Sequence, residues 1–145
     1  MNNIALVIYM AATSYQVDPT VLYSLCNVES NLNPAAVNKH DGGPGQHSLG
    51  LCQVKYTTAR LMGMPADRNC VNSHKLRRCS LMQPEINATY AAAYLRYQLD
   101  RYRGNIRKAI SAYNAGTYTR RNSKYVRKVL SPSRTVVPRS GVGTK

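Results

Sequence analysis

Apolar residues recur along most of the chain at spacings of three and four residues, which is typical of amphipathic helices. Asp18 followed by Pro19 predicts a sharp helix start, because Asp accepts hydrogen bonds from the free amides of the first turn and Pro needs no such partner. Gly63, Gly104 and Gly116 predict helix ends. The expected helices cover about residues 4–15, 19–30, 57–62, 84–102, 105–115 and 124–130. No convincing strand alternation appears, so the pattern predicts an all-α fold.

Two stretches carry no long helical pattern. The first, NKHDGGPGQHSLG, is polar and rich in glycine, and its length is typical of a functional loop. The second runs from about residue 64 to residue 80, and a disulfide between its Cys70 and Cys79 would close it. Thr57 or Thr58 is the expected N-cap of the short helix between the two stretches.

The charge of the chain points to polyanionic partners. Twenty Lys and Arg against six Asp and Glu give a formal net charge of +14 at pH 7, and much of it lies after residue 95. Nucleic acid, anionic membranes and acidic cell-wall polymers all fit this sign. A length of 145 residues with 43% hydrophobic content indicates one folded domain. We interpret residues 1–130 as that domain and residues 131–145 as a basic, flexible tail.

The four cysteines are an even number and fit two disulfides, with buried free thiols as the alternative. They form no CxxC pair and the three His are scattered, so neither a metal site nor a cofactor is expected. The apolar stretch from Ile4 to Ala12 has the length of a signal-peptide core but follows no Lys or Arg, so it is interpreted as a helix rather than a secretory signal. No transmembrane segment is predicted.

Glu29 occupies a position where a carboxyl group is costly. It lies three residues after Cys26 and seven after Leu22, so it shares the apolar face of its helix. Burial disfavours the ionised form and raises the pKa, which suits a general acid. A structural Glu bonded to the neighbouring loop is the alternative. Glu85 falls in a first helical turn, where its charge is expected only to favour the helix dipole.

Four sequence blocks occur in the order found in one enzyme family. They are Glu29-Ser30, SLGLCQ from Ser48, AYNAG from Ala112, and the late Tyr125. Over about residues 5–130 the chain resembles the soluble lytic transglycosylase catalytic domain of the lysozyme-like superfamily, in which these blocks read Glu-Ser, S-x-G-L-M-Q, A-Y-N-A-G and Tyr. The resemblance implies a single-domain lysozyme-like fold, all-α or α+β at most, with a catalytic helix and a cleft.

The resemblance implies that Glu29 is the catalytic residue of a peptidoglycan lytic transglycosylase. In that family one Glu protonates the β-1,4 glycosidic oxygen between N-acetylmuramic acid and N-acetylglucosamine, then takes the proton of the C6 hydroxyl to form a 1,6-anhydromuramyl product. Gly50 is expected to let the backbone approach a sugar closely, and the Tyr113 hydroxyl is implied to contact Glu29. The implied substrate-binding residues are Ser48, Gly50, Leu51, Gln53, Tyr113, Asn114 and Tyr125.

Lys55 bears on whether the reaction consumes water. Goose-type lysozymes are similar and carry an acid just after their G-L-M-Q-V block, where this chain has Lys55. Because hydrolysis usually needs a second carboxylate, this departure favours the transglycosylase over a hydrolytic muramidase, which stays the alternative. A basic nucleic-acid-binding protein is a weaker alternative based on charge and 11 Tyr. The dispersed Lys and Arg form no recognised module, so no specific nucleic acid is expected.

Cys52 departs from the family, which usually has Met at that position. Because Cys26 lies almost one turn before Glu29, a Cys26–Cys52 bridge is expected to tie the catalytic helix to the loop, with free thiols as the alternative. The resemblance implies action on peptidoglycan glycan strands at the bacterial cell wall, in the periplasm. Family members of this size include phage lysins, virion-borne enzymes and enzymes of secretion machines. Proteins of a phage virion or a secretion machinery are therefore the expected partners, with delivery by a phage particle or lysis machinery.

Overall fold

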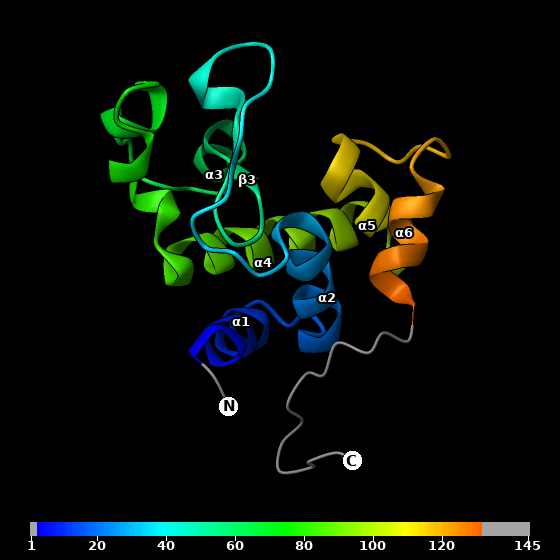
Figure 1. Ribbon diagram of the computed structural model, residues 1–145. Coiled ribbons are helices and arrows are strands. Elements are labelled where there is room, and N and C mark those ends of the chain that lie inside the picture. The colour runs from blue at the N-terminus through cyan, green and yellow to red at the C-terminus, as the bar shows by residue number, and fades with distance from the viewer. Residues whose placement is uncertain (1–2, 132–145) are drawn as a thin grey trace.

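The computed structural model describes residues 3–131, and α-helices carry most of this part of the chain (Figure 1). The α-helices are α1 (Asn3–Ser14), α2 (Pro19–Ser30), α3 (Tyr56–Leu61), α4 (Pro84–Arg101), α5 (Ile106–Ala115) and α6 (Ser123–Leu130). The strands are β1 (Val37–Asn38), β2 (Ser48–Leu49) and β3 (Val54–Lys55). Short 3-10 helices are η1 (Pro44–Gln46), η2 (Arg68–Val71), η3 (Leu76–Arg78) and η4 (Ser80–Met82).

Helix α2 begins and ends where the local sequence predicts. The Asp18 carboxylate accepts a hydrogen bond from the Thr20 amide at 2.8 Å, and Pro19 takes the first helical position. Asn31 ends the helix in the left-handed conformation, with φ of 58°. These two ends fix the register of the helix whose last turn carries Glu29.

Helix α4 is the centre of the packing. Helices α1 and α5 both pack against it, and its buried face includes Ala88, Ala91, Ala92 and Leu95. Helix α2 packs in turn against α1 and α6, and Figure 1 shows it between them. The last described helix therefore lies against the helix that carries Glu29.

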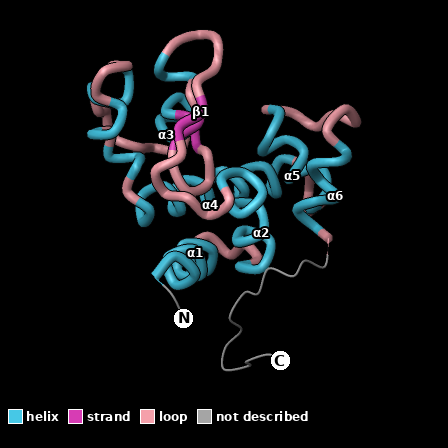
Figure 2. The backbone as a smooth tube through the Cα atoms, in the orientation of Figure 1, coloured by secondary structure: helices cyan, strands magenta, loops and turns pink. Residues whose placement is uncertain are grey.

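A small antiparallel sheet, which the sequence pattern does not reveal, stands beside the helices (Figure 2). Its order is β1-β2-β3, and Leu49 pairs with Val37 on one side and with Val54 on the other. Each strand has two residues, which is too short for alternation to appear in the sequence. The fold is mainly helical with a small sheet, which is the α+β limit of the lysozyme-like expectation.

The N-cap predicted for the short helix α3 is wrong. The helix begins at Tyr56 with Lys55 as its N-cap, and no side chain caps it. Thr57 and Thr58 lie inside the first turn instead. Both threonines line the cleft described below, so they are placed near a binding surface rather than at a helix end.

The segment after α3, about residues 64–80, contains the expected Cys70–Cys79 disulfide. Next to the bridge, the Asp67 carboxylate accepts hydrogen bonds from the Asn69 amide at 3.0 Å and the Ser80 amide at 2.8 Å. These bonds hold the pKa of Asp67 below its usual value. This segment is thus closed by a disulfide and by hydrogen bonds from both of its ends to one carboxylate.

Nearly all of the predicted basic tail, residues 132–145, lies outside the described residues. Among the helices of residues 3–131, none combines the length and apolar character needed to cross a membrane.

Candidate active site

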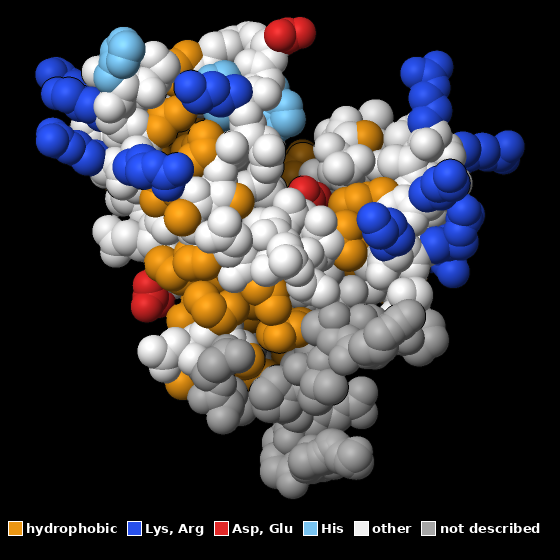
Figure 3. All heavy atoms as spheres, viewed as in Figure 1, with side chains coloured by type: hydrophobic (Ala, Val, Ile, Leu, Met, Phe, Trp, Pro, Cys, Tyr) orange, Lys and Arg blue, Asp and Glu red, His pale blue; other side chains and the backbone are white. Residues whose placement is uncertain are grey.

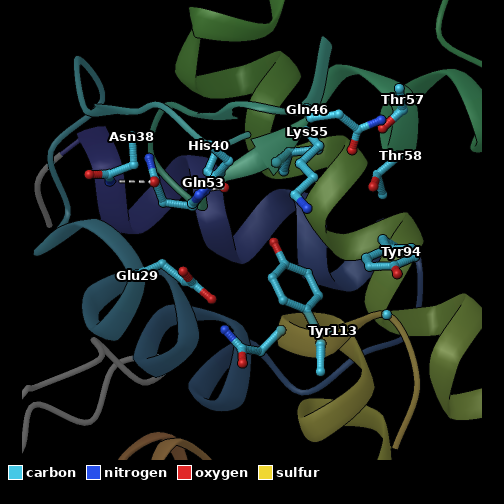
Figure 4. Close-up of a pocket in the computed structure, with 15 residues that line it drawn as sticks. Glu29, Asn38, His40, Gln46, Gln53, Lys55, Thr57, Thr58, Tyr94 and Tyr113 are labelled. Atoms are coloured by element: carbon cyan, nitrogen blue, oxygen red, sulfur yellow. Dashed lines mark hydrogen bonds between the residues drawn. The ribbon is translucent and has the colours of Figure 1, made fainter. Parts of the chain in front are cut away.

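A cleft of about 410 Å³ opens between the small sheet and helix α3 on one side and helices α4 and α5 on the other. Figure 3 shows the surface hollowed between two lobes, and Figure 4 shows Glu29 approaching from α2, Lys55 from β3 and Tyr113 from α5. The polar side chains that line the cleft include those of Glu29, Asn38, Gln46, Gln53, Lys55 and Asn114.

Among the described residues 3–131, Glu29 is the one carboxylate that lines this cleft. Burial raises its pKa above the ordinary value of 4.5, and hydrogen bonds from Tyr125 and Asn114 oppose that rise. The Tyr125 hydroxyl donates to Glu29 Oε2 at 2.6 Å. A buried carboxyl with a raised pKa holds its proton at higher pH than an exposed one, and the two hydrogen bonds fix its orientation.

The Tyr113 hydroxyl does not bond to Glu29, which corrects the contact implied by the resemblance. Tyr113 donates instead to the Cys52 carbonyl at 2.8 Å, and Tyr125 takes the place beside Glu29. Tyr125 reaches the carboxylate because α6 packs against α2. The Glu29 charge still helps to raise the pKa of Tyr113, after burial as the larger cause, so the buried ring stays protonated next to the cleft.

A disulfide and a hydrogen bond join the last turn of α2 to the loop between β2 and β3. Cys26 pairs with Cys52, as expected, and both residues are fully buried. The Ser30 hydroxyl, next to Glu29, donates to the Leu51 carbonyl at 2.5 Å. The Glu-Ser pair therefore combines a cleft carboxylate with a side chain that anchors the facing loop.

Gln53 shapes the loop that forms the upper wall of the cleft. It has a left-handed backbone with φ of 56°, and its side-chain amide donates to the Gly50 carbonyl at 3.0 Å. Its side-chain oxygen accepts a hydrogen bond from Asn38 at 2.6 Å, which Figure 4 marks. These bonds tie the Gln53 side chain to the backbone of its own loop and to β1.

The profile of the family described as "Transglycosylase SLT domain" matches residues 7–132 of the sequence. The chain belongs to this family. The match begins within α1 and extends past the end of α6, so it includes every residue that lines the cleft.

The chain has similar relatives in phages and in a bacterium. The chain is 30% identical over 107 residues to a transglycosylase of Enterobacteria phage PRD1, and this match covers 74% of the chain and 32% of that protein. It is 31% identical over 116 residues to the membrane-bound lytic murein transglycosylase C of Photorhabdus laumondii, covering 75% of this chain and 30% of that protein. It is also 33% identical over 87 residues to an uncharacterized 20.7 kDa protein of Enterobacteria phage T4, covering 60% of this chain and 47% of that protein. The chain thus spans less than half the length of these relatives.

The SLT motif residues divide between the cleft surface and its support. Four of the residues expected to bind substrate line the cleft, namely Ser48, Gln53, Tyr113 and Asn114. Gly50 and Leu51 are not part of the lining; both are buried, and Leu51 has no exposed surface. The close neighbour of Gly50 is the side chain of Asn87 in the interior. Tyr125 acts on the site through its bond to Glu29.

Asn87 supports the loop between β2 and β3, a role that was not predicted from the sequence. It is fully buried in α4, and its side-chain oxygen accepts the Cys52 amide at 2.8 Å. Its amide group donates to the carbonyls of Leu49 and Leu81, each at 2.8 Å. The sequence does contain a sign of this role. Asn87, Ala91 and Leu95 follow one another at intervals of four residues, so a polar residue lies on the apolar face of the helix, as Glu29 does in α2.

Two other acidic positions do not add to the chemistry of the cleft. Asp41 lies exposed in the glycine-rich loop and does not line the cleft. Asp67 lies near the sulfurs of Cys70 and Cys79, but those thiols are consumed in the disulfide and cannot serve as thiolate ligands to a metal.

Proposed function

We propose that this domain is a peptidoglycan lytic transglycosylase that cleaves the β-1,4 bond between N-acetylmuramic acid and N-acetylglucosamine and forms a 1,6-anhydromuramyl product. The observation that carries the proposal is a single buried carboxyl, Glu29, in the cleft of a chain that belongs to the SLT family. The names of two relatives, a phage transglycosylase and a lytic murein transglycosylase, support it.

One carboxyl performs both proton transfers in this reaction. The raised pKa of Glu29 favours its protonated form, and this form donates its proton to the glycosidic oxygen as the bond to C1 breaks. The resulting carboxylate then accepts the proton of the muramyl C6 hydroxyl, and the C6 oxygen bonds to C1. The proton balance closes within the step, so Glu29 is again protonated and no water is consumed.

The surrounding residues orient this carboxyl. Tyr125 holds one oxygen of Glu29 at 2.6 Å, a hydrogen bond from Asn114 also reaches the carboxylate, and Glu29 lines the cleft. Asn114, at the edge of the same cleft, and Ser48 on the opposite wall supply polar groups for the sugar hydroxyls and acetamido groups. These residues bind and position the substrate, and the chemistry rests on Glu29.

A hydrolytic muramidase is the alternative, and the products distinguish the two reactions. Purified sacculi are digested with the chain, and the soluble muropeptides are analysed by mass spectrometry in ordinary water and in water enriched in heavy oxygen. We expect muropeptides one water molecule lighter than the hydrolytic products, with no heavy oxygen at C1. Reducing ends that carry heavy oxygen would overturn the transglycosylase proposal in favour of hydrolysis.

We further propose that the domain acts at the bacterial cell wall, in the periplasm, and reaches it with a phage particle or lysis machinery. Two of the relatives named above belong to phages, which supports this route. Fractionation of an infected culture, with immunodetection of the chain in purified virions and in the periplasm, tests the proposal. Detection only in the host cytoplasm would contradict it.

A further inference from the structure

Lys55 brings a positive charge into the cleft that the proposed reaction does not use. It is the last residue of β3, where the preceding Val54 is 3% exposed and faces the core. Because successive side chains of a strand point to opposite faces, Lys55 is directed away from the core and lines the cleft. Figure 4 shows its ammonium group reaching into the cleft above Tyr113.

The ammonium group of Lys55 is available to a ligand. Within residues 3–131 the one ion pair is Arg96–Asp100, and no hydrogen bond to the Lys55 side chain is present there. Lys55 does not pair with Glu29, the one carboxylate in the cleft lining, and it is not among the causes that shift the Glu29 pKa. A cation in a polar cleft without a protein counter-charge favours an anionic group of the ligand.

The side chains of Lys55 and Glu29 occupy different places in the cleft. In Figure 4 it projects between Glu29 on one side and Thr57 and Thr58 on the other. The glycan backbone of peptidoglycan is neutral apart from the lactyl arm of each muramyl residue. That arm carries either a free carboxylate or a peptide that bears carboxylates.

We propose that Lys55 binds a carboxylate carried on the lactyl arm of a muramyl residue, and so makes the cleft selective for muramyl units. This inference rests on the proposed function, because it takes peptidoglycan as the substrate. The shared chemistry is a carboxylate, and its two sources are the lactyl group itself and the attached peptide.

Direct binding tests the proposal without relying on turnover. Glycan strands are titrated by calorimetry into the Glu29→Gln variant, which keeps the ligand intact, and into the same variant with Lys55→Met or Lys55→Arg. Three strand preparations are used: strands with their peptides, strands stripped of peptide that expose the lactyl carboxylate, and stripped strands whose carboxylates have been converted to neutral amides. Lys75→Met is the matched control, because Lys75 is exposed and lies outside the cleft lining.

We expect Lys55→Met to weaken binding of at least one carboxylate-bearing preparation about tenfold, and to leave binding of the neutral strands nearly unchanged. Loss confined to the peptide-bearing strands would identify a peptide carboxylate as the partner, and loss on the stripped acid strands would identify the lactyl carboxylate. Lys55→Arg should retain most of the affinity, because it keeps the charge. Lys75→Met should leave the affinity for each of the three preparations nearly unchanged, because its exposed charge is screened by salt.

Two results would overturn the inference. An equal loss of affinity for all three preparations would mean that Lys55 shapes the cleft and does not bind a carboxylate. Unchanged affinity throughout would mean that Lys55 takes no part in binding. The proposed function is tested separately, by the products that the unaltered chain releases. Thermal unfolding shows whether each variant is folded.

Discussion

A Cβ placed on Gly50 would lie 2.6 Å from the side-chain amide nitrogen of Asn87. Gly50 also has φ of +76°, a conformation that side chains rarely adopt. The loop that faces Glu29 is therefore seated on α4 by a contact that only glycine permits. That contact lets Asn87 reach the backbone of Leu49 and Cys52 on either side of the glycine.

Gly50→Ala should destabilise the domain more than a glycine replacement in open space. Backbone strain costs about 1–2 kcal/mol, and displacing the buried Asn87 amide adds roughly 1–3 kcal/mol. Thermal unfolding measures the sum. Gly104→Ala is the matched control, because Gly104 has a similar φ of +83° with nothing within 4 Å of the added Cβ. Equal destabilisation by the two substitutions would mean that Asn87 is not under constraint.

Glu29→Gln should abolish release of soluble muropeptides from sacculi while leaving the fold intact. The amide keeps the shape of the carboxyl but neither donates nor accepts the required proton, and general acid and base catalysis contributes about 100- to 10,000-fold. Turbidity clearing and product analysis measure the loss. Glu85→Gln is the control, because Glu85 lies in the first turn of α4 and outside the cleft lining, and it should have little effect. Substantial residual activity in Glu29→Gln would remove Glu29 from the central role.

The same substitution should stabilise the protein in a manner that depends on pH. Because the pKa of Glu29 in the folded state is raised above 4.5, its contribution to stability is fully present below about that pH and is lost as the pH rises through the folded value. Glu29→Gln should therefore raise Tm near pH 7 and lose that advantage below pH 4.5. A Tm difference that does not change with pH would contradict the desolvation of Glu29.

Tyr125→Phe should move the pH profile of the reaction. The Tyr125 hydroxyl stabilises the charged form of Glu29, so removing it raises the Glu29 pKa further. The alkaline limb of kcat against pH should shift upward, and kcat should fall because the carboxylate loses its orientation. Tyr97→Phe is the control, since Tyr97 is 43% exposed and does not line the cleft. A fall in activity without a shift of the profile would assign Tyr125 a packing role only.

Alkylation of the protein without prior reduction should modify none of the four cysteines, because the two disulfides engage them all. The bridges differ in the loop they close, since Cys26–Cys52 spans 26 residues and Cys70–Cys79 spans 9. Loop entropy alone gives about 3.5 kcal/mol for the longer loop and about 2.6 kcal/mol for the shorter one. Paired Cys→Ser variants, compared by denaturant unfolding, should follow that order. Four alkylated cysteines in native protein would contradict both bridges.

The sequence predicts those features of the fold that depend on local chemistry. The starts and ends of α2 and α5 follow from Asp18, Asn105 and Gly116, whose side chain or backbone conformation acts within a few residues. Glu29 stands out because a carboxyl on an apolar face is costly wherever the helix packs. The two-residue strands do not stand out, because a period of two residues cannot be recognised in so short a segment.

Features that depend on long-range packing are not predictable from the pattern. Tyr113 and Tyr125 are both tyrosines on predicted helices, and which of them reaches Glu29 depends on how α6 lies against α2. The role of Asn87 depends on the Gly50 loop, which lies about 37 residues earlier in the chain and bonds to it through backbone groups. The resemblance named the motif residues but did not predict the contacts among them.

The bond between Tyr125 and Glu29 joins residues separated by 96 positions, and a second bond of 2.5 Å joins the Ser24 hydroxyl to the Val129 carbonyl across the same pair of helices. Helix α6 has only eight residues, too few to be stable before it packs on α2. During synthesis the ribosome must therefore release almost the whole domain before the carboxyl acquires its final setting. A growing or prematurely terminated chain contains Glu29 without the Tyr125 hydroxyl that orients it. The order of translation therefore delays assembly of a complete site.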